Sequence, residues 1–284
     1  MDPIRNQDVA SLTDVSQLDI PSLPIIAVKV LDILSRESSN ADDLAGIIAF
    51  DPSFVSRLLK TANSPYFGIG DGVSSIDGAI LRLGFDTISD IVVMAALKDI
   101  RRHADAIDIG LWEHSTAVAV ACKLIADELG YGNPTEHLIH GLLHDIGKMI
   151  MNINFKEKYT LVVDEVRSSG KPFEDVESAV FGFTHCGIGD YTARRWKLPV
   201  EIRSAISLHH CSASELADRK DIKDVLLVKI ADHVCSELQI GIYDNLVPID
   251  KDLEFIGLTE VSKIDSLKKK AEEEYPKYKS FMLG

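Results

Sequence analysis

The sequence predicts an all-α fold made of two packed helical lobes. Apolar residues recur with helical spacing almost throughout the chain, and no window of strict two-residue alternation is long enough to indicate a sheet. Apolar residues make up 46% of the 284 positions, which suffices for one large domain or two compact lobes. The charged stretch from Lys98 to Asp105 is the best candidate boundary. We therefore expect lobes at residues 1–105 and 106–284.

Capping residues divide the N-terminal lobe into short helices. Asp51 followed by Pro52 is typical of a helix start, because proline is tolerated at the first helical position. Ser75 can cap a later helix that ends at Gly84. Asn63 precedes Ser-Pro at the end of its helix, where asparagine can close a helix through its own backbone contacts. We expect Asn63 to be structural.

Helical periodicity continues through the C-terminal lobe. Asn133 and Pro134 form the clearest start signal there, as a cap followed by proline at the first helical position. The predicted helices cover residues 112–129, 133–150, 159–168, 174–181, 186–196, 200–209 and 225–238.

Composition excludes several classes of protein. Thirty basic against 44 acidic residues give a net charge of −14, which disfavours nucleic acid as a partner. The basic run Lys268–Lys270 is followed by Glu272–Glu274, which is typical of a solvated helix face. Apolar runs such as Ile91–Leu97 are too short to span a membrane, and no signal peptide is visible. Four cysteines without close pairing indicate free thiols, so we expect a cytoplasmic protein with no membrane partner.

Histidines are concentrated in the C-terminal lobe, where they include the doublets His144-Asp145 and His209-His210. Imidazole and carboxylate together suit zinc, iron, manganese or nickel, and helices can supply such ligands to a bundle core. His144-Asp145 interrupts an apolar run, and burying both without partners would cost several kcal/mol. The pair can share one ion or serve two, and the spacing permits either. The histidines of this lobe are His114, His137, His140, His144, His185, His209, His210 and His233.

Other residues of these types have simpler interpretations. His103 and His137 are expected to be ordinary surface or core histidines, and His233 to be structural. His140 lies one turn before His144, so it can line the pocket or support a ligand as an alternative to plain packing. Two cysteines that follow histidines, Cys186 and Cys211, are expected to be packing residues rather than ligands.

Several sequence runs resemble the HDOD (HD-related output domain) family over about residues 18–240. The resemblance implies a bacterial signalling module whose C-terminal lobe is an HD-domain-like helical bundle. The runs that resemble the N-terminal lobe of the family are Leu23–Pro24, Asp51–Pro52, Leu58–Ser64 and Ser74–Gly84, and those that resemble its HD lobe are Leu142–Lys148 and Trp196–Pro199.

The order of ligand-type residues is similar to that of the HD-GYP phosphodiesterases, which bind two metals. The resemblance implies one or two divalent ions (iron, manganese, zinc or nickel) and no organic cofactor. The sequence departs from that pattern at Cys211–Ser214, which replaces the GYP loop associated with cyclic di-GMP, and at Gly110, where some relatives carry an acidic residue. The implied ligands are His114, His144, Asp145 and Asp232 for one ion, and His185, His209 and His210 for a second.

Two functions remain open at this point. The first is a signalling output module that retains the metal site and recognises a signalling protein or a small phosphate-containing ligand without turnover. The alternative is a metal-dependent phosphohydrolase or phosphodiesterase acting on a nucleotide or cyclic dinucleotide. In that case Asp145 would orient a metal-bound hydroxide and Lys148 would offset charge on the phosphoryl group. The sequence leaves catalysis undecided.

Overall fold

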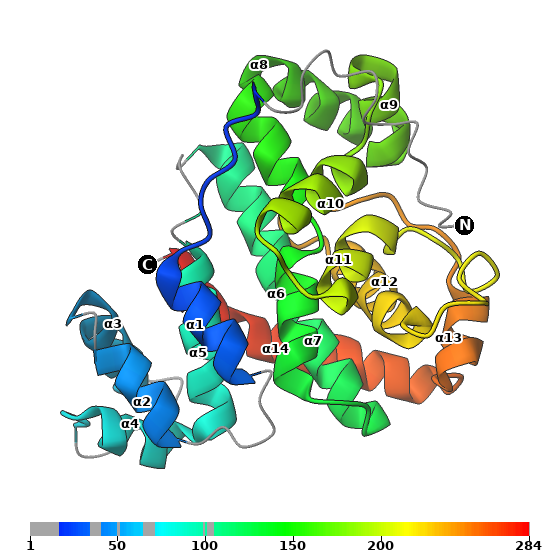
Figure 1. Ribbon diagram of the computed structural model, residues 1–284. Helices are drawn as coiled ribbons and strands as arrows, with labels where there is room; N and C mark the ends of the chain where they lie inside the picture. Colours follow the sequence, from blue (N-terminus) through cyan, green and yellow to red (C-terminus); the bar gives the residue numbers. More distant parts are fainter. Residues whose placement is uncertain are drawn as a thin grey trace. The chain divides into compact units, whose positions relative to one another are not determined.

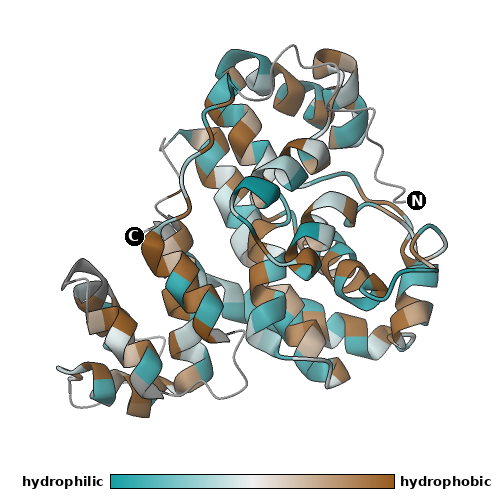
Figure 2. Ribbon diagram, in the orientation of Figure 1, coloured by the Kyte–Doolittle hydropathy of each residue, from teal (hydrophilic) through white to brown (hydrophobic). Residues whose placement is uncertain are grey.

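The computed structural model describes residues 17–34, 41–49, 52–64, 72–98, 100 and 105–283, and these residues form fourteen α-helices and no strand. The predicted all-α class is therefore confirmed. Figure 2 shows hydrophobic and hydrophilic residues alternating along most of these helices, as expected of helices that bury one face. Asp51 and His103 lie outside the described residues.

The chain divides into two compact units, each built from separate stretches of sequence. Ser22–Arg101 and Glu274–Gly284 belong to one unit, which we call the N-terminal unit. Met1–Pro21 and Arg102–Glu273 belong to the other, the C-terminal unit. A domain boundary at residue 105 stays a prediction. None of the described helices is both long and apolar enough to cross a membrane.

The N-terminal unit has an apolar helix as its core. The residues of α5 from Ile88 to Leu97 are all buried, and α1, α2 and α4 pack against this helix. The end of α14 contributes Tyr278, whose hydroxyl donates a 3.0 Å hydrogen bond to Asp90 Oδ2. The helices of this unit are α1 (Ile25–Leu34), α2 (Ala41–Ala49), α3 (Pro52–Ala62), α4 (Ile76–Leu83), α5 (Phe85–Lys98) and the last part of α14 (Val261–Leu283).

The predicted capping residues of the N-terminal unit are confirmed where they are described. The Ser75 side chain accepts from the Gly78 N–H at the start of α4, and Gly84 ends that helix with φ of 80°. Asn63 donates through Nδ2 to the carbonyls of Leu59 and Val73, and its Oδ1 accepts from the Val73 N–H. Asn63 is thus structural, since its side chain fastens the end of α3 to the segment before α4.

The C-terminal unit is built around α6 (Figure 1), against which α7, α8 and α12 pack. Asp105 and Asn133 cap the starts of α6 and α7 with side-chain oxygens, as the second of these was predicted to do. The helices of this unit are α6 (Ala106–Leu129), α7 (Pro134–Leu143), α8 (Ile146–Ser169), α9 (Phe173–Phe181), α10 (His185–Arg195), α11 (Val200–Leu208), α12 (Ile222–Glu237), α13 (Asp250–Ile256) and most of α14.

The helices of the C-terminal unit differ from prediction mainly around the His-Asp doublet. The helix predicted over 133–150 is broken, because α7 ends at Leu143 and α8 begins at Ile146. Helix α8 then continues through residues predicted as a break, with a kink at Phe155 (φ −135°, ψ 38°). Helix α13 was not predicted. The break after Leu143 matters most, since it places His144 and Asp145 between two helices.

Candidate metal centre

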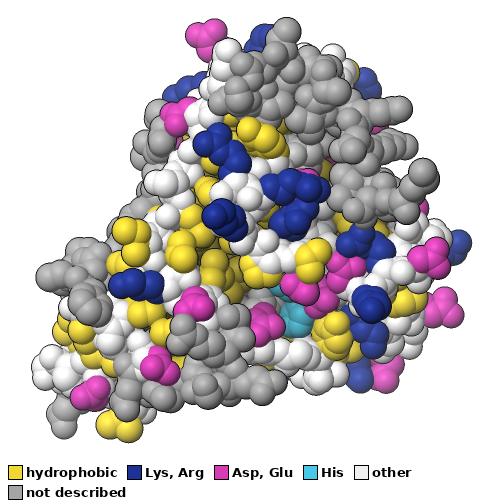
Figure 3. Space-filling model, in the orientation of Figure 1, with side chains coloured by type: hydrophobic (Ala, Val, Ile, Leu, Met, Phe, Trp, Pro, Cys, Tyr) yellow, Lys and Arg dark blue, Asp and Glu magenta, His cyan; other side chains and the backbone are white. Residues whose placement is uncertain are grey.

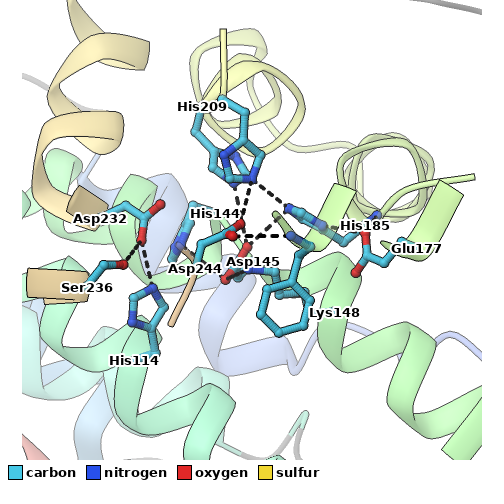
Figure 4. A network of polar contacts seen from close by, with 12 residues as sticks. His114, His144, Asp145, Lys148, Glu177, His185, His209, Asp232, Ser236 and Asp244 are labelled. Carbon is cyan, nitrogen blue, oxygen red and sulfur yellow. Dashed lines mark hydrogen bonds and ion pairs between the residues drawn. The ribbon is translucent and has the colours of Figure 1, made fainter. Parts of the chain in front are cut away.

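The ligand-type residues of the C-terminal unit converge from α6, from α12 and from the ends of α7, α8, α10 and α11 (Figure 4). His114 and Asp232 lie within helices α6 and α12, whereas the others lie at helix ends, where side chains are free to turn inward. Their candidate ligand atoms fall into three overlapping groups, and within each group these atoms all lie within 4.8 Å of one another. The groups are His114 with His144 and Asp232; His144 with Asp145 and His209; and His185 with Cys186, His209 and His210.

Asp145 is the hub of the centre. It is 1% exposed, and its Oδ2 lies 2.8 Å from Lys148 Nζ and 3.3 Å from His144 Nε2. Its Oδ1 lies 3.5 Å from His185 Nε2 and 3.6 Å from His209 Nε2. Burial opposes ionisation of this carboxyl, but His144 and Lys148 hold its pKa well below the usual range. Asp145 is therefore an anion placed between three imidazoles.

A glycine allows α10 to approach this hub. A Cβ on Gly147 would overlap the backbone carbonyl of His185, so only glycine fits where α8 begins beside the start of α10. That contact holds His185, the first residue of α10, close to Asp145. The glycine that follows the His-Asp doublet by two positions is thus part of the site's construction.

His114 and Asp232 form the side of the centre nearest α6 and α12. His114 Nε2 lies 2.9 Å from Asp232 Oδ1, and His114 Nδ1 lies 3.2 Å from the Ile240 carbonyl. The carbonyl contact favours a proton on Nδ1, which orients Nε2 toward the carboxylate. Burial by itself would raise the pKa of Asp232, but its hydrogen bond with His114 lowers it. His114 and Asp232 thus form a buried pair whose Nε2 and Oδ1 atoms lie close enough to bind one shared cation.

Glu177 on α9 is a functional residue that sequence reasoning missed. It is fully buried, and its Oε2 lies 2.6 Å from His185 Nδ1 and accepts the His185 N–H at 2.7 Å. Its Oε1 accepts from the Tyr159 hydroxyl at 3.0 Å. Burial alone would lower the pKa of His185, but the charge of Glu177 holds this pKa well above its ordinary value. A carboxylate on Nδ1 fixes the histidine ring, and here it directs Nε2 toward His210 Nε2, 3.0 Å away.

Asp244 is a second missed residue, in the segment after α12. Its Oδ1 accepts from the backbone N–H of Phe173 and Asn245. Its Oδ2 lies 3.9 Å from His210 Nε2 and has no hydrogen-bond partner among the described residues. Burial raises the pKa of Asp244, while the nearby Lys148 lowers it. Asp244 thus adds a carboxylate beside the His210 end of the centre.

The centre has more negative charge than its own cations offset. Lys148 is 1% exposed, and although burial alone would lower its pKa, the surrounding aspartates raise it, so the side chain is a fixed cation. In the described part of the chain, the Nε2 atoms of His144 and His209 and the two oxygens of Asp145 make no hydrogen bond of good geometry, although Asp145 Oδ2 is paired with Lys148 at 2.8 Å. Buried nitrogen and oxygen atoms that lack hydrogen bonds can serve as ligands of a divalent cation. The buried carboxylates of the centre are Asp145, Glu177, Asp232 and Asp244.

The remaining histidines and cysteines lie apart from the hub or are poor ligands. Cys186 is buried beside His185, and burial raises the pKa of its thiol to about 12, which disfavours the metal-binding thiolate. His233 lies 4.0 Å from Glu237 on its own helix, as expected of a structural residue. His137 and His140 lie on α7 and form a separate group with Asp224.

Gly110 stands where an acidic residue was considered from the sequence, and packing explains the glycine. The Ile242 N–H donates to the Gly110 carbonyl at 2.9 Å, and a Cβ on residue 110 would lie 2.7 Å from Ile242 Cγ1. An acidic side chain therefore cannot occupy this position unless the 240–242 segment moves. That segment also supplies the carbonyl that orients His114.

A cavity of about 150 Å³ opens beside the centre and reaches His210, Asp232 and Asp244. Among the described side chains of the face in Figure 3, histidine appears in one small patch bordered by acidic groups. Lys229, which also lines the cavity, lies 2.7 Å from Asp252 and donates to the Cys211 carbonyl. This lysine is already paired, and the other charged residues of the wall are Glu174, Asp175, Asp232 and Asp244, so the wall is mainly acidic.

Curated relatives of this chain are distant. An uncharacterised protein of Treponema pallidum (strain Nichols) is 23% identical over 193 residues, which are 68% of this chain and 38% of the relative. The uncharacterised protein YuxH of Bacillus subtilis (strain 168) is 25% identical over 122 residues, 43% of this chain and 30% of YuxH. The matched part spans less than half the length of either relative.

Solved structures share the fold. An HDOD domain protein of unknown function from Geobacter sulfurreducens has a TM-score of 0.78 and 26% identity, with 90% of this chain and 92% of that chain covered. A protein from Marinobacter aquaeolei, provisionally named a signal transduction protein, has a TM-score of 0.76 and 19% identity (93% and 60% covered). One from Shewanella amazonensis, provisionally named a phosphohydrolase, has a TM-score of 0.66 and 21% identity (92% and 93% covered). The two last likenesses concern the fold alone.

The family model of the HDOD domain matches residues 20–212. The match includes the His-Asp doublet and both histidines of the doublet at 209–210, whereas Asp232 and Asp244 lie beyond it. Since the match covers more than half of the sequence, the chain belongs to the HDOD family.

Proposed function

We propose that this protein is a bacterial signal-transduction output module of the HDOD type that retains a divalent metal centre. The observation that carries the proposal is the set of orphaned donors around Asp145, a buried carboxylate between three imidazoles. HDOD membership supports the signalling role, and the ligand geometry supports the metal.

The proposed ligands divide between two positions that share Asp145. Fixed imidazoles and carboxylates of this kind suit iron, manganese, zinc or nickel. Glu177 would keep the His185 ring in the ligating tautomer, as its 2.6 Å contact with Nδ1 indicates. The residues that would hold the first ion are His114, His144, Asp145 and Asp232, and those for the second are His185, His209 and His210 with the shared Asp145.

The charge of the cavity indicates how a small ligand would be recognised. Its wall includes Glu174, Asp175 and Asp232, and its lysine is already paired with Asp252. Such a wall repels a phosphate group unless cations in the centre offset the carboxylates. We therefore infer that a phosphate-containing ligand binds only to the metal-loaded protein.

Hydrolysis of a phosphoester is a second candidate function, favoured by the cavity that reaches His210 and Asp232. A bound divalent ion would supply Lewis acidity and a hydroxide near neutral pH. Asp145 would orient that hydroxide from its place at the hub. Lys148, held 2.8 Å from Asp145 and cationic, would stabilise negative charge nearby.

A paired assay separates the two functions. Protein purified without chelator is measured for metal content and then for turnover of a generic phosphodiester such as bis(4-nitrophenyl) phosphate, with manganese or iron(II) added. Bound metal without turnover supports the signalling module, and turnover that Asp145→Ala and Lys148→Ala both abolish supports the hydrolase. Absence of any metal from wild-type protein after incubation with each ion would refute the proposed centre.

A further inference from the structure

A second group of metal-ligand side chains lies between α7 and α12, outside the centre described above. His137 and His140 occupy one face of α7 at a spacing of three residues, and Asp224 lies near the start of α12. One ligand atom from each of the three lies within 4.8 Å of the others. The three residues share no ligand with the Asp145 centre.

The nitrogen of His137 that faces Asp224 carries a lone pair. The His137 ring hydrogen-bonds with the Tyr131 backbone, and its Nε2 lies against the loop at Gly132. A proton on Nε2 satisfies that contact and leaves Nδ1 unprotonated. His137 Nδ1 lies 3.8 Å from Asp224 Oδ1, so two acceptors face each other across a gap. A cation in the gap would satisfy both.

His140 presents the same unsatisfied chemistry. Its side chain is 5% exposed and its ring stands edge-on to His137, with centroids 5.3 Å apart. Among the residues that the structure describes, none hydrogen-bonds to the Nδ1 atom of His137 or of His140. Burial lowers the pKa of His137 to about 4 and of His140 to about 3, so both rings are neutral and able to ligate.

The surroundings of Asp224 are electronegative. Burial and the charges of Asp221, Glu201 and Glu136 together raise the pKa of Asp224 to about 6, while a hydrogen bond from Tyr131 opposes the shift. An ionised Asp224 is thus destabilised in the metal-free protein, and a bound cation would relieve this cost. If the two histidines were only packing residues with satisfied hydrogen bonds, no buried carboxylate beside them would need its charge offset.

We propose that His137, His140 and Asp224 form a second divalent-cation site that fastens α7 to α12, separate from the Asp145 centre. Two imidazoles and one carboxylate suit zinc or a similar borderline ion, with a fourth position left for water. Because α12 carries Asp232 and α7 leads directly into His144, a metal ion bound here would hold these two residues of the main centre in position.

The test uses zinc with the full chain, stripped of metal by chelator, in an Asp145→Ala background that removes the main centre. We expect this protein to bind one equivalent of zinc and to show a higher Tm with zinc. Adding His140→Gln or, separately, Asp224→Asn should abolish both effects. Adding His233→Gln, a histidine of α12 outside the group, should leave both unchanged and serves as the control.

A zinc-edge anomalous difference map of the same protein locates the ion. Density between His137 Nδ1, His140 and Asp224 is the expected result. Zinc stoichiometry and Tm shift that survive both His140→Gln and Asp224→Asn, or an anomalous peak elsewhere, would overturn the proposal. Circular dichroism of each variant before zinc addition verifies that the fold is intact.

Discussion

The cores of the two units are stabilised in different ways. In the N-terminal unit α5 is buried over Ile88–Leu97, and its buried Asp90 accepts a hydrogen bond from Tyr278. In the C-terminal unit the core contains four buried carboxylates, a buried lysine and several imidazoles with nitrogens that lack a hydrogen bond. Every candidate metal group found among the described residues lies in the C-terminal unit. The described core of the first unit is mainly apolar, whereas we propose that the core of the second holds a cation.

The largest expected effect of this difference is on the response to chelation. Removing metal should destabilise the C-terminal unit by roughly 4 kcal/mol where the ion was present at about 1,000 times its Kd. The N-terminal unit should keep its stability, since none of the candidate metal groups lies among its described residues. Hydrogen exchange measured by mass spectrometry, with and without chelator, distinguishes them: protection should fall in α10 and α11 and stay constant in α5. Equal loss in both units would contradict the comparison.

A smaller effect is expected from the carboxylate behind His185. Glu177→Gln keeps the shape of the side chain but removes the charge that fixes the His185 ring, so metal affinity should fall by about 10- to 100-fold. Burial alone would lower the pKa of His185, but the charge of Glu177 keeps this pKa high in metal-free protein, so metal binding to wild type near neutral pH should release a proton. Titration calorimetry in two buffers of different ionisation enthalpy measures both quantities. The exposed Glu165→Gln on α8 is the matched control, and an equal affinity for both variants would exclude this role.

In the N-terminal unit the expected effect is on stability alone. Asn63→Ala removes three hydrogen bonds to the backbone of Leu59 and Val73, which should lower the free energy of unfolding by about 1 kcal/mol. Urea unfolding measures that change. Metal content should be the same as in wild type, and a change in metal content would show that the two units are not chemically separate.

The smallest expected effect concerns the cap of α6. Burial alone would raise the pKa of Asp105, but the Asp108 N–H and Lys156 lower it below the ordinary value. A carboxyl with a depressed folded-state pKa stabilises above its unfolded pKa of about 4 and loses that contribution as pH falls through the lower folded value. Metal-free Asp105→Asn, which can still cap, should therefore lose less stability than wild type between pH 5 and pH 3. Parallel urea midpoints would contradict this assignment.

The sequence allowed the helical class and the candidate ligands to be predicted because both depend on local signals. Pro52, Ser75 and Asn133 indicate helix starts, and the His-Asp doublet is a polar pair within an apolar run. The break between α7 and α8 carries no glycine or proline at 144–145, so local propensity could not reveal it. Tertiary packing of α8 against α10 determines that break.

The two missed carboxylates differ in how visible they were. Glu177 follows Phe173 by four residues, so it lies on the buried face of α9, and an acid on an apolar face was an available signal. Asp244 lies in an irregular segment whose path depends on backbone contacts with Phe173, and nothing in its own sequence neighbourhood marks it. Asp244 reaches the site through contacts with residues distant in sequence, which no local pattern encodes.

The most direct test of the central claim is anomalous diffraction from crystals of wild-type protein purified without chelator. The account predicts an ion within about 2.0–2.2 Å of Asp145 and of ligating imidazole nitrogens. It also predicts that the corresponding peak is absent from Asp145→Ala, whose lost carboxylate joins the two proposed positions. A crystal grown with added manganese, iron or zinc that shows no anomalous density around Asp145, with His144 and His209 still directed at it, would contradict the claim.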